Sequence, residues 1–258
     1  MFIIWLVLSL LSTWLVIVVL VNDFSLKTLN LKNLLGKKGF NSLIIYPHPD
    51  DETMASGGLI QILKKYGNVK VITVTKGQYG TELVKLPPNE LAELRSNEFK
   101  GAMKALNIND YELWEFIDGT LIENTINLTK QIKDTINSYN PDLIVTYERS
   151  GVYGHPDHIS LSKAVNESVE NTNIKVLYST LPKKILKKFK LPTTLNGIPI
   201  PEFQKQSEPE FKLFTLKYNL AKLRASKKYK SQNLSHGIPL EVMHSVNIFE
   251  YYTTKYKD

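Results

Sequence analysis

The chain has 258 residues, of which 43 % are apolar and 22 % charged, and its formal net charge is +7. This composition is typical of a folded chain with one core of roughly 200 residues, and it excludes a disordered protein. Cysteine is absent, which excludes disulfides, thiolate metal sites and cysteine nucleophiles. A metal ion would have to be held by His, Asp or Glu, and the chain has only five histidines.

The first 22 residues, MFIIWLVLSLLSTWLVIVVLVN, contain no charged side chain. A bilayer-spanning helix needs about 20 mostly apolar residues, and residues 1–22 meet that length. A cleaved signal peptide and a buried core helix are the alternatives. The first would normally have a basic start and a shorter apolar run, and the second would normally have a polar face. We therefore expect an uncleaved transmembrane anchor.

Residues 23–40 form a basic, polar stretch that we expect to act as a tether. The stretch carries four lysines and one acidic residue, Asp23. Lysine and arginine concentrate on the cytoplasmic side of membrane segments, so this bias predicts the orientation of the single-pass membrane protein that residues 1–22 indicate. Its larger C-terminal domain should lie on the cytoplasmic side.

Strand and helix patterns alternate between residues 41 and 180, which we expect to form the core of the domain. Short β-branched runs predict strands, and apolar residues at helical spacing predict the helices between them. The expected strands cover 42–46, 69–75, 111–116, 143–147 and 175–179, and the expected helices cover 53–66, 90–106, 122–139 and a segment after Pro156. This alternation predicts an α/β fold with a mostly parallel sheet.

Residues 181–258 are less regular and rich in lysine, and we expect them to form a C-terminal extension that completes the domain. Within them, residues 183–190 (KKILKKFK) interleave lysines with apolar side chains. This stretch fits a solvated surface helix, and the alternative is an interfacial segment that presses on anionic lipid. Nucleic-acid binding is not expected, because no recognised nucleic-acid module accompanies the positive charge.

Two polar clusters follow two of the predicted strands. Residues 47–52 read PHPDDE directly after the strand at 42–46, and residues 154–158 read GHPDH a few residues past the strand at 143–147. Ligands of parallel α/β sheets bind beyond the carboxyl ends of the strands, so both clusters should meet at that edge. Three of the five histidines fall in these two clusters.

The residue types and their spacing in these clusters favour a metal site. A catalytic zinc ion takes three protein ligands, from imidazole nitrogens or carboxylate oxygens, and a water. His48 and Asp51 are three positions apart in a strand-to-helix turn, and one of His155 and His158 can complete the set. The other histidine is then free for proton transfer, and Asp50 could hold a water. One cluster alone fits an ordinary helix start with an acidic cap, but two clusters at strand ends favour the metal.

PHPDDE followed by GHPDH resembles the signature pair of the LmbE-like, or PIG-L, de-N-acetylase family. That family includes N-acetylglucosaminyl-phosphatidylinositol de-N-acetylase and bacterial deacetylases of N-acetylglucosamine conjugates. The resemblance covers roughly residues 41–180, with a weaker tail to about residue 232. It implies a Rossmann-like fold with helices on both faces of the sheet, and a zinc-dependent amide hydrolase. Ferrous iron is the alternative metal.

The resemblance also implies a role for each matching residue of the first motif and for one residue of the second. By position, it implies that His48, Asp51 and His158 are the metal ligands. Asp50 then corresponds to the general base, which takes a proton from the attacking water. This assignment is compatible with the ligand set that the residues themselves suggest.

Four further residues receive roles through the same resemblance. His155 corresponds to a histidine that assists proton transfer to the departing amine, and Tyr153 to a tyrosine that helps to bind the oxyanion. Asp157 resembles an acidic partner that orients a histidine. Arg95, in the Arg-Ser-Asn-Glu segment of the helix at 90–106, resembles an arginine near the substrate.

The combined interpretation is a membrane-anchored, zinc-dependent de-N-acetylase. Its substrate would carry an N-acetylglucosamine-type group, and the anchor and the basic stretch suit a lipid-linked glycan. Another metal-dependent amidase, acting on a small acylated amine, is the first alternative. A catalytically idle metal-binding scaffold is the second, and the presence of Asp50 and His155 beside the expected ligands argues against it.

Overall fold

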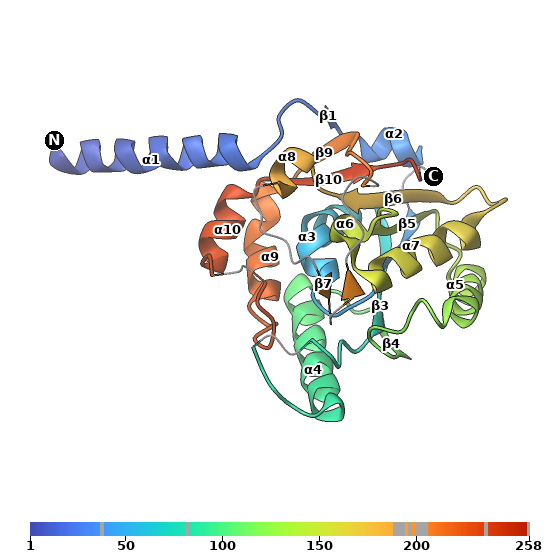
Figure 1. Cartoon of the computed structure of the whole chain (residues 1–258). Coiled ribbons are helices and arrows are strands. Elements are labelled where there is room, and N and C mark those ends of the chain that lie inside the picture. The colour runs from blue at the N-terminus through green and yellow to red at the C-terminus, as the bar shows by residue number, and fades with distance from the viewer. Residues whose placement is uncertain are drawn as a thin grey trace.

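A central eight-stranded sheet organises the protein, with strand order β1-β9-β10-β6-β5-β2-β3-β4 (Figure 1). The computed structural model describes residues 1–36, 39–80, 83–187, 206–234 and 237–256, and the backbone of 194–195 and 198–199. The strands are β1 Lys27–Thr28, β2 Phe40–Tyr46, β3 Gly67–Thr75, β4 Tyr111–Phe116, β5 Leu143–Tyr147, β6 Lys175–Thr180, β9 Phe211–Phe214 and β10 Phe249–Thr253. A separate two-stranded sheet pairs β7 Thr194–Leu195 with β8 Ile198–Pro199.

The helices lie between and beside these strands. They are α1 Phe2–Val21, α2 Leu31–Leu35, α3 Asp51–Leu63, α4 Pro88–Leu106, α5 Thr125–Tyr139, α6 Gly151–Gly154, α7 Pro156–Val169, α8 Lys183–Leu186, α9 Asn219–Ser226 and α10 Leu240–Val246, with a short 3₁₀ turn at Leu216–Tyr218. The five strands and four helices expected between residues 41 and 180 are all present, with small shifts at their ends.

Strands β6, β5, β2, β3 and β4 run parallel to one another, which confirms the expected mostly parallel sheet. The chain leaves β2 toward β3 and β4 on one side, and it returns to β5 and β6 on the other. The strand order therefore reverses between β2 and β5. Beyond the carboxyl ends of these two strands lies the crevice in which α/β sheets bind their ligands.

Helices cover both faces of the sheet, as expected. Alternate residues of β2 face opposite sides: Ile44 and Tyr46 are buried with residues of α3, α4 and α9, whereas Leu43 and Ile45 are buried with residues of α5 and α7. A strand that is apolar at consecutive positions must be covered on both faces, because successive side chains point in opposite directions. This explains why the unbroken apolar run of β2 occupies the centre of the sheet.

The C-terminal segment contributes strands and helices to the same domain. β10 pairs antiparallel with both β6 and β9. Glu250, buried on β10, accepts hydrogen bonds from the backbone N–H groups of Gly58 and Leu59 at 2.7 and 2.8 Å, and from the Lys222 ammonium at 2.7 Å. One carboxylate thus joins β10 to α3 and α9.

The segment 23–40 differs from the expected polar tether. β1 pairs parallel with β9, and Leu29 and Leu31 are buried in the main core. Lys27 and Lys32 are exposed beside them. The leucines of this segment bury apolar area against the sheet, so the number of lysines is a poor guide to its conformation. The folded domain therefore begins before residue 41.

Helix α1 is long and apolar enough to cross a membrane, a property that signal sequences and buried core helices share. It projects away from the domain, and of its side chains Val18 alone is fully buried (Figure 1). Ser12 and Thr13 donate hydrogen bonds to the carbonyl oxygen of Ser9, which satisfies their hydroxyl groups within the helix.

Candidate active site

The crevice between β2 and β5 brings the two polar clusters together. The first cluster forms the turn between β2 and α3, and the second begins at the end of α6 and continues into α7. Pro156 occupies the first turn of α7, where its missing N–H costs no hydrogen bond and its fixed φ suits a helix. Both clusters therefore lie at the carboxyl edge of the sheet, as predicted.

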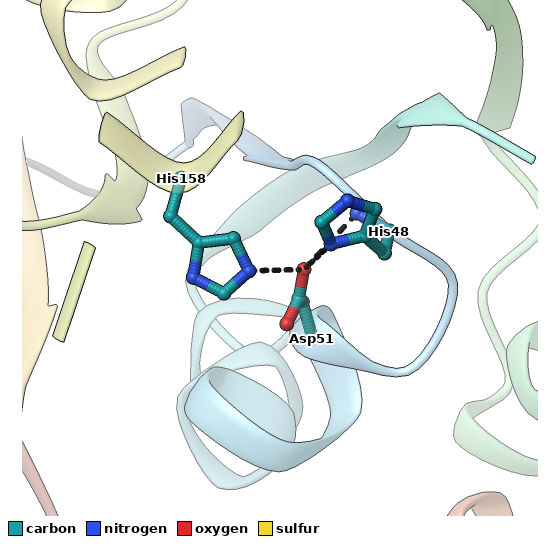
Figure 2. A group of neighbouring side chains, drawn as sticks. All are labelled: His48, Asp51 and His158. Atoms are coloured by element: carbon teal, nitrogen blue, oxygen red, sulfur yellow. Dashed lines mark hydrogen bonds and ion pairs between the residues drawn. The ribbon is translucent and has the colours of Figure 1, made fainter. Parts of the chain in front are cut away.

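His48, Asp51 and His158 converge on one point in this crevice (Figure 2). The Asp51 Oδ2 atom lies 3.3 Å from His48 Nδ1 and 3.5 Å from His158 Nε2. All three side chains are buried. The other carboxylate oxygen, Oδ1, accepts a 2.7 Å hydrogen bond from the hydroxyl of Tyr147, so it faces away from the histidines.

Both imidazoles are oriented by hydrogen bonds on the side away from Asp51. His158 Nδ1 lies 3.1 Å from the carbonyl oxygen of Gly151, to which it can only donate. In the neutral ring Nε2 then carries the free lone pair, and this buried atom has no hydrogen-bond partner in the part of the chain that the structure describes. His48 Nε2 lies 3.1 Å from Asp118 and 3.3 Å from Asp157, which leaves Nδ1 to face Asp51.

These three residues fit a divalent metal ion. Ligands at about 2.0–2.1 Å from a tetrahedral zinc ion are about 3.4 Å from one another, which matches the 3.3 and 3.5 Å separations here. Two imidazoles and a carboxylate are a ligand set of catalytic zinc sites, and each histidine has an outer hydrogen bond that fixes its ring. The orphaned Nε2 of His158 is the atom that a metal would satisfy.

His48, His155 and Asp157 form a second group with metal-ligand spacing. Both oxygens of Asp157 already accept backbone hydrogen bonds, from Gly119 at 2.7 Å and from Leu121 at 3.1 Å. Its carboxylate is buried and held in place against the edge of the His48 ring. Asp157 therefore serves to orient His48, because its carboxylate is already occupied and is poorly placed to bind an ion.

Asp50 lies beside the candidate ligands in a strained conformation, with φ of 115°. Such a positive φ is unfavourable for a residue with a side chain, by about 1–3 kcal/mol. Its backbone N–H donates to Glu52 at 3.1 Å, and Arg95 contacts its carboxylate at 3.3 Å. Burial raises the pKa of Asp50 well above its ordinary value, and the Arg95 guanidinium opposes this rise.

Arg95 is buried, with 3 % of its surface exposed. Besides Asp50, its guanidinium donates to the carbonyl oxygens of Pro49 at 2.6 Å and Gly77 at 3.0 Å. The structure thus places the expected substrate arginine behind Asp50, where it braces the turn of the first motif. Its role toward a substrate stays a prediction.

His155 forms the N-terminal cap of α7, where its Nδ1 accepts a hydrogen bond from the Asp157 N–H at 3.2 Å. Burial, together with the nearby imidazoles of His158 and His48, lowers the pKa of His155 to about 2. The ring is therefore neutral, with its proton on Nε2. Tyr153 lies near both second-cluster histidines, with its ring centroid 5.1 Å from that of His158 and 6.2 Å from that of His155.

Comparison with known proteins agrees with this arrangement. Residues 43–169 match the family model described as PIG-L, GlcNAc-PI de-N-acetylase. Residues 43–169 form a PIG-L domain. The match contains both polar clusters, the second half of β2 and the strands β3 to β5, but it ends before β6, β9 and β10.

Two curated relatives of the PIG-L domain carry deacetylase names. A probable N-acetyl-α-D-glucosaminyl L-malate deacetylase 2 of Bacillus cereus is 35 % identical over 133 residues, which is 49 % of this chain and 60 % of that protein. A 1D-myo-inositol 2-acetamido-2-deoxy-α-D-glucopyranoside deacetylase of Kineococcus radiotolerans is 29 % identical over 153 residues, which is 47 % of this chain and 42 % of that protein. The chain thus spans about half the length of the curated relatives it matches.

A solved structure shows that the likeness in fold extends beyond the PIG-L match. N,N'-diacetylchitobiose deacetylase from Pyrococcus horikoshii superposes with a TM-score of 0.61 over 88 % of this chain and 90 % of that one, at 20 % identity. The fold is therefore the one that the sequence motifs imply, an α/β sheet with helices on both faces.

Two residues of the PIG-L site were absent from the sequence-based set. Asp118 follows β4 and contacts His48, and Tyr147 ends β5 and contacts Asp51. Asp118 obeys the same rule that located the clusters, a polar residue just past a strand, but a lone acidic residue is too common to stand out. Tyr147 belongs to an apolar strand and is also a buried core residue. Its ring stacks on that of His158, with 4.3 Å between the ring centroids.

We expect Tyr147→Phe to weaken metal binding about 10- to 100-fold, the usual loss when an outer hydrogen bond to a metal ligand is removed. The phenyl ring would keep the stacking on His158, so the change isolates the hydroxyl. Tyr178→Phe is the matched control, because it removes a tyrosine hydroxyl that bonds to Asn166 instead. Competition with a coloured chelator measures both affinities, and equal affinities would show that the Tyr147 hydroxyl does not tune Asp51.

Proposed function

We propose that this protein is a metal-dependent de-N-acetylase that hydrolyses the acetamide of an N-acetylglucosamine-type conjugate. The observation that carries the proposal is the convergence of His48, Asp51 and His158 beside the strained Asp50. Three ligands and an adjacent carboxylate are what metal-assisted hydrolysis requires. The names of the curated relatives, which are deacetylases of glucosamine conjugates, support the substrate class.

His48, Asp51 and His158 would hold the ion. When bound, a divalent ion supplies Lewis-acid polarisation of the acetyl carbonyl and lowers the pKa of water. We propose zinc, with ferrous iron as the alternative, because a site of two imidazoles and one carboxylate suits both. Asp118 and Asp157 keep His48 oriented by accepting from its Nε2–H.

Asp50 would act as the general base. Its carboxylate lies next to the ligand Asp51, so it can take a proton from a water that attacks the acetyl carbon. The interaction with Arg95 and the hydrogen bond to Glu52 fix this side chain and its backbone, so little reorganisation is needed when the proton moves. Asp50 carries that proton until the amine departs.

The departing nitrogen must be protonated, because an amide nitrogen cannot leave as an anion. The protonated Asp50 is placed to supply this proton, and we assign His155, whose Nε2 carries a hydrogen, to assist the transfer by hydrogen bonding to the departing group. The Tyr153 ring lies against the rings of His155 and His158, beside the candidate ligands. We assign Tyr153 to the oxyanion and Arg95 to positioning near the substrate.

The anchor also belongs to this proposal. We propose that α1 holds the enzyme in a membrane as a single-pass protein with the catalytic domain on the cytoplasmic side, as the lysines after α1 suggest. The catalytic unit would comprise residues 41–180 together with the flanking strands. A lipid-linked amino-sugar conjugate suits an enzyme held at a membrane, and a free conjugate is the alternative substrate.

The test is amine release from a panel of acetylated compounds. The panel contains free and lipid-linked N-acetylglucosamine conjugates and simple acylated amines, each assayed before and after dialysis against a chelator. We expect release from an amino-sugar conjugate, its loss on chelation and its return with added Zn²⁺ or Fe²⁺. Release from the simple amines alone would favour a general amidase, and no release with metal bound would favour a scaffold.

A further inference from the structure

The C-terminal part of α1, from Trp14 to Val21, is fixed to the domain. The Trp14 indole N–H donates to the carbonyl oxygen of Ser245 in α10 at 3.2 Å. Val18 packs against Val246 and Ile248 in a small apolar cluster. Asn22, just past the helix, donates to the carbonyl oxygen of Val246 at 2.7 Å. The anchor helix and the domain are therefore joined by hydrogen bonds and apolar packing along two turns of α1.

This interface leaves too little free helix to span a bilayer. At 1.5 Å per residue the whole of α1 is about 30 Å long, which equals the thickness of the hydrocarbon layer. The segment Trp14–Val21, which contacts the domain, accounts for about 12 Å of that length, so about 18 Å projects freely. If α1 spans the membrane, the domain surface beside Trp14 must reach into the lipid.

The domain surface at this place exposes several apolar side chains, although Lys212 lies over the Phe249 ring at 5.6 Å. Phe24 and Phe214 flank Phe249, with ring centroids 5.2 and 5.9 Å from it, and Phe249 packs against the cluster around Val18. Val242 lies one turn before Val246 on α10, and therefore on the face that meets α1. We call Phe24, Phe214 and Val242 the collar. Phe214 is 50 % and Val242 46 % exposed.

Exposed apolar side chains of α1 lie at the same level as the collar and would be covered by lipid. Leu15, Val16, Val19 and Leu20 lie beside the docked residues of α1, and all four are exposed. Lys184 at the base of α1 is also exposed and pairs with Asp23 at 2.9 Å. A basic residue near an anionic surface contributes about 1 kcal/mol to membrane binding. The acidic Glu241 next to Val242 is neutralised by Lys227 at 2.5 Å.

We infer that the collar is a membrane-contact surface, immersed in the bilayer that α1 spans. This inference rests on the proposed anchoring. The bilayer is the occupant favoured by the short free length of α1 and by the continuity of the collar with exposed helix side chains. Because the contact with α10 is rigid, immersion would fix the tilt of the catalytic domain relative to the membrane.

Spin-label depth measurements test this on the full chain, since the absence of cysteine allows single labels without background. Labels are placed in the collar by Phe214→Cys and Val242→Cys, and in the anchor by Leu11→Cys. Ile126→Cys is the control, because Ile126 is an exposed apolar residue, 87 % accessible, on α5 at the far side of the domain (Figure 1). Each protein is reconstituted into vesicles of phosphatidylcholine and phosphatidylserine.

The readout is the relative collision rate of each label with oxygen, which enters lipid, and with a neutral nickel chelate, which stays in water. We expect oxygen to dominate at Leu11, Phe214 and Val242, and nickel to dominate at Ile126. Nickel-dominated collisions at both collar positions, with oxygen dominant at Leu11, would overturn the inference and leave the anchor intact. Protection from both reagents with spin–spin broadening would identify a second copy of the chain instead.

Failure of the anchor would look different. A Leu11 label that collides mainly with nickel would show that α1 is not in the bilayer, and the collar inference would fall with it. Amine release by the same labelled proteins is measured in parallel and does not depend on either result. Circular dichroism of each variant shows that the label has left the fold intact.

Discussion

His48→Ala is expected to lose both the bound metal and the deacetylase activity. His48 supplies one of three ligand atoms, and a metal held by Asp51 and His158 alone would bind far more weakly and lack a fixed position. The substitution would also remove the partner of Asp118 and Asp157, and it would leave two buried carboxylates close together. We expect metal content well below one ion per chain and amine release at the background rate.

The control for this variant is His244→Ala. His244 is also buried and hydrogen-bonded, with Nε2 2.9 Å from the Ser226 hydroxyl, but it lies on α10 outside the crevice. This change should keep one metal ion per chain and most of the activity. Elemental analysis by mass spectrometry and the amine-release assay measure the two proteins side by side. Stoichiometric metal in the His48 variant would refute the ligand assignment.

Asp50→Asn is expected to keep the metal and to lose most of the turnover. An amide cannot accept the proton of the attacking water, and a positioned general base contributes about 10²- to 10⁴-fold to such reactions. Asparagine keeps the size of the side chain and adopts positive φ more readily than most residues, so the turn should survive. We therefore expect kcat to fall by about 10²- to 10⁴-fold while KM changes little.

Asp110→Asn provides the comparison for charge alone. Asp110 is an exposed aspartate that pairs with Lys70 at 3.1 Å, far along the chain from the motifs. It should leave kcat unchanged. Turnover of Asp50→Asn near that of the unmodified enzyme would mean that another group accepts the proton, and the proposed mechanism would have to be rebuilt around it.

The ligands of the candidate site could be predicted because their geometry is largely local. His48 and Asp51 share one turn, and the turn follows a strand whose apolar pattern is unmistakable. The strand-end rule then places His158 at the same crevice. The resemblance to a known motif pair added the distinction between His155 and His158, which spacing alone leaves open.

The outer residues of the site could not be predicted in this way. The contact between Asp118 and His48 depends on the register of β4 and on the path of the loop after it. The contact between Tyr147 and Asp51 depends on which face of β5 meets α3. These relations arise from long-range packing, and a single sequence without alignment carries little signal for them.

The boundaries of the domain were the least predictable feature of the fold. β1 has two residues and β9 has four, which is too short for an alternating pattern to stand out. Their pairing is decided by partners elsewhere in the chain: β1 joins β9, and β9 joins β10. The lysine-rich composition of residues 23–40 therefore predicted a tether, whereas the structure places β1 of the main sheet in this segment.

The position of β10 has a practical consequence for anyone who would express this protein in pieces. A fragment that ends at residue 169, where the family likeness stops, would lack β6 and β10 and would uncover the long flank of β5. Unpaired hydrogen-bonding groups along such a flank invite edge-to-edge association between molecules. The same cut would remove Glu250 and strip α3 of its buried carboxylate partner. Fragments that contain only the two motifs and the matched residues 43–169 should therefore be insoluble.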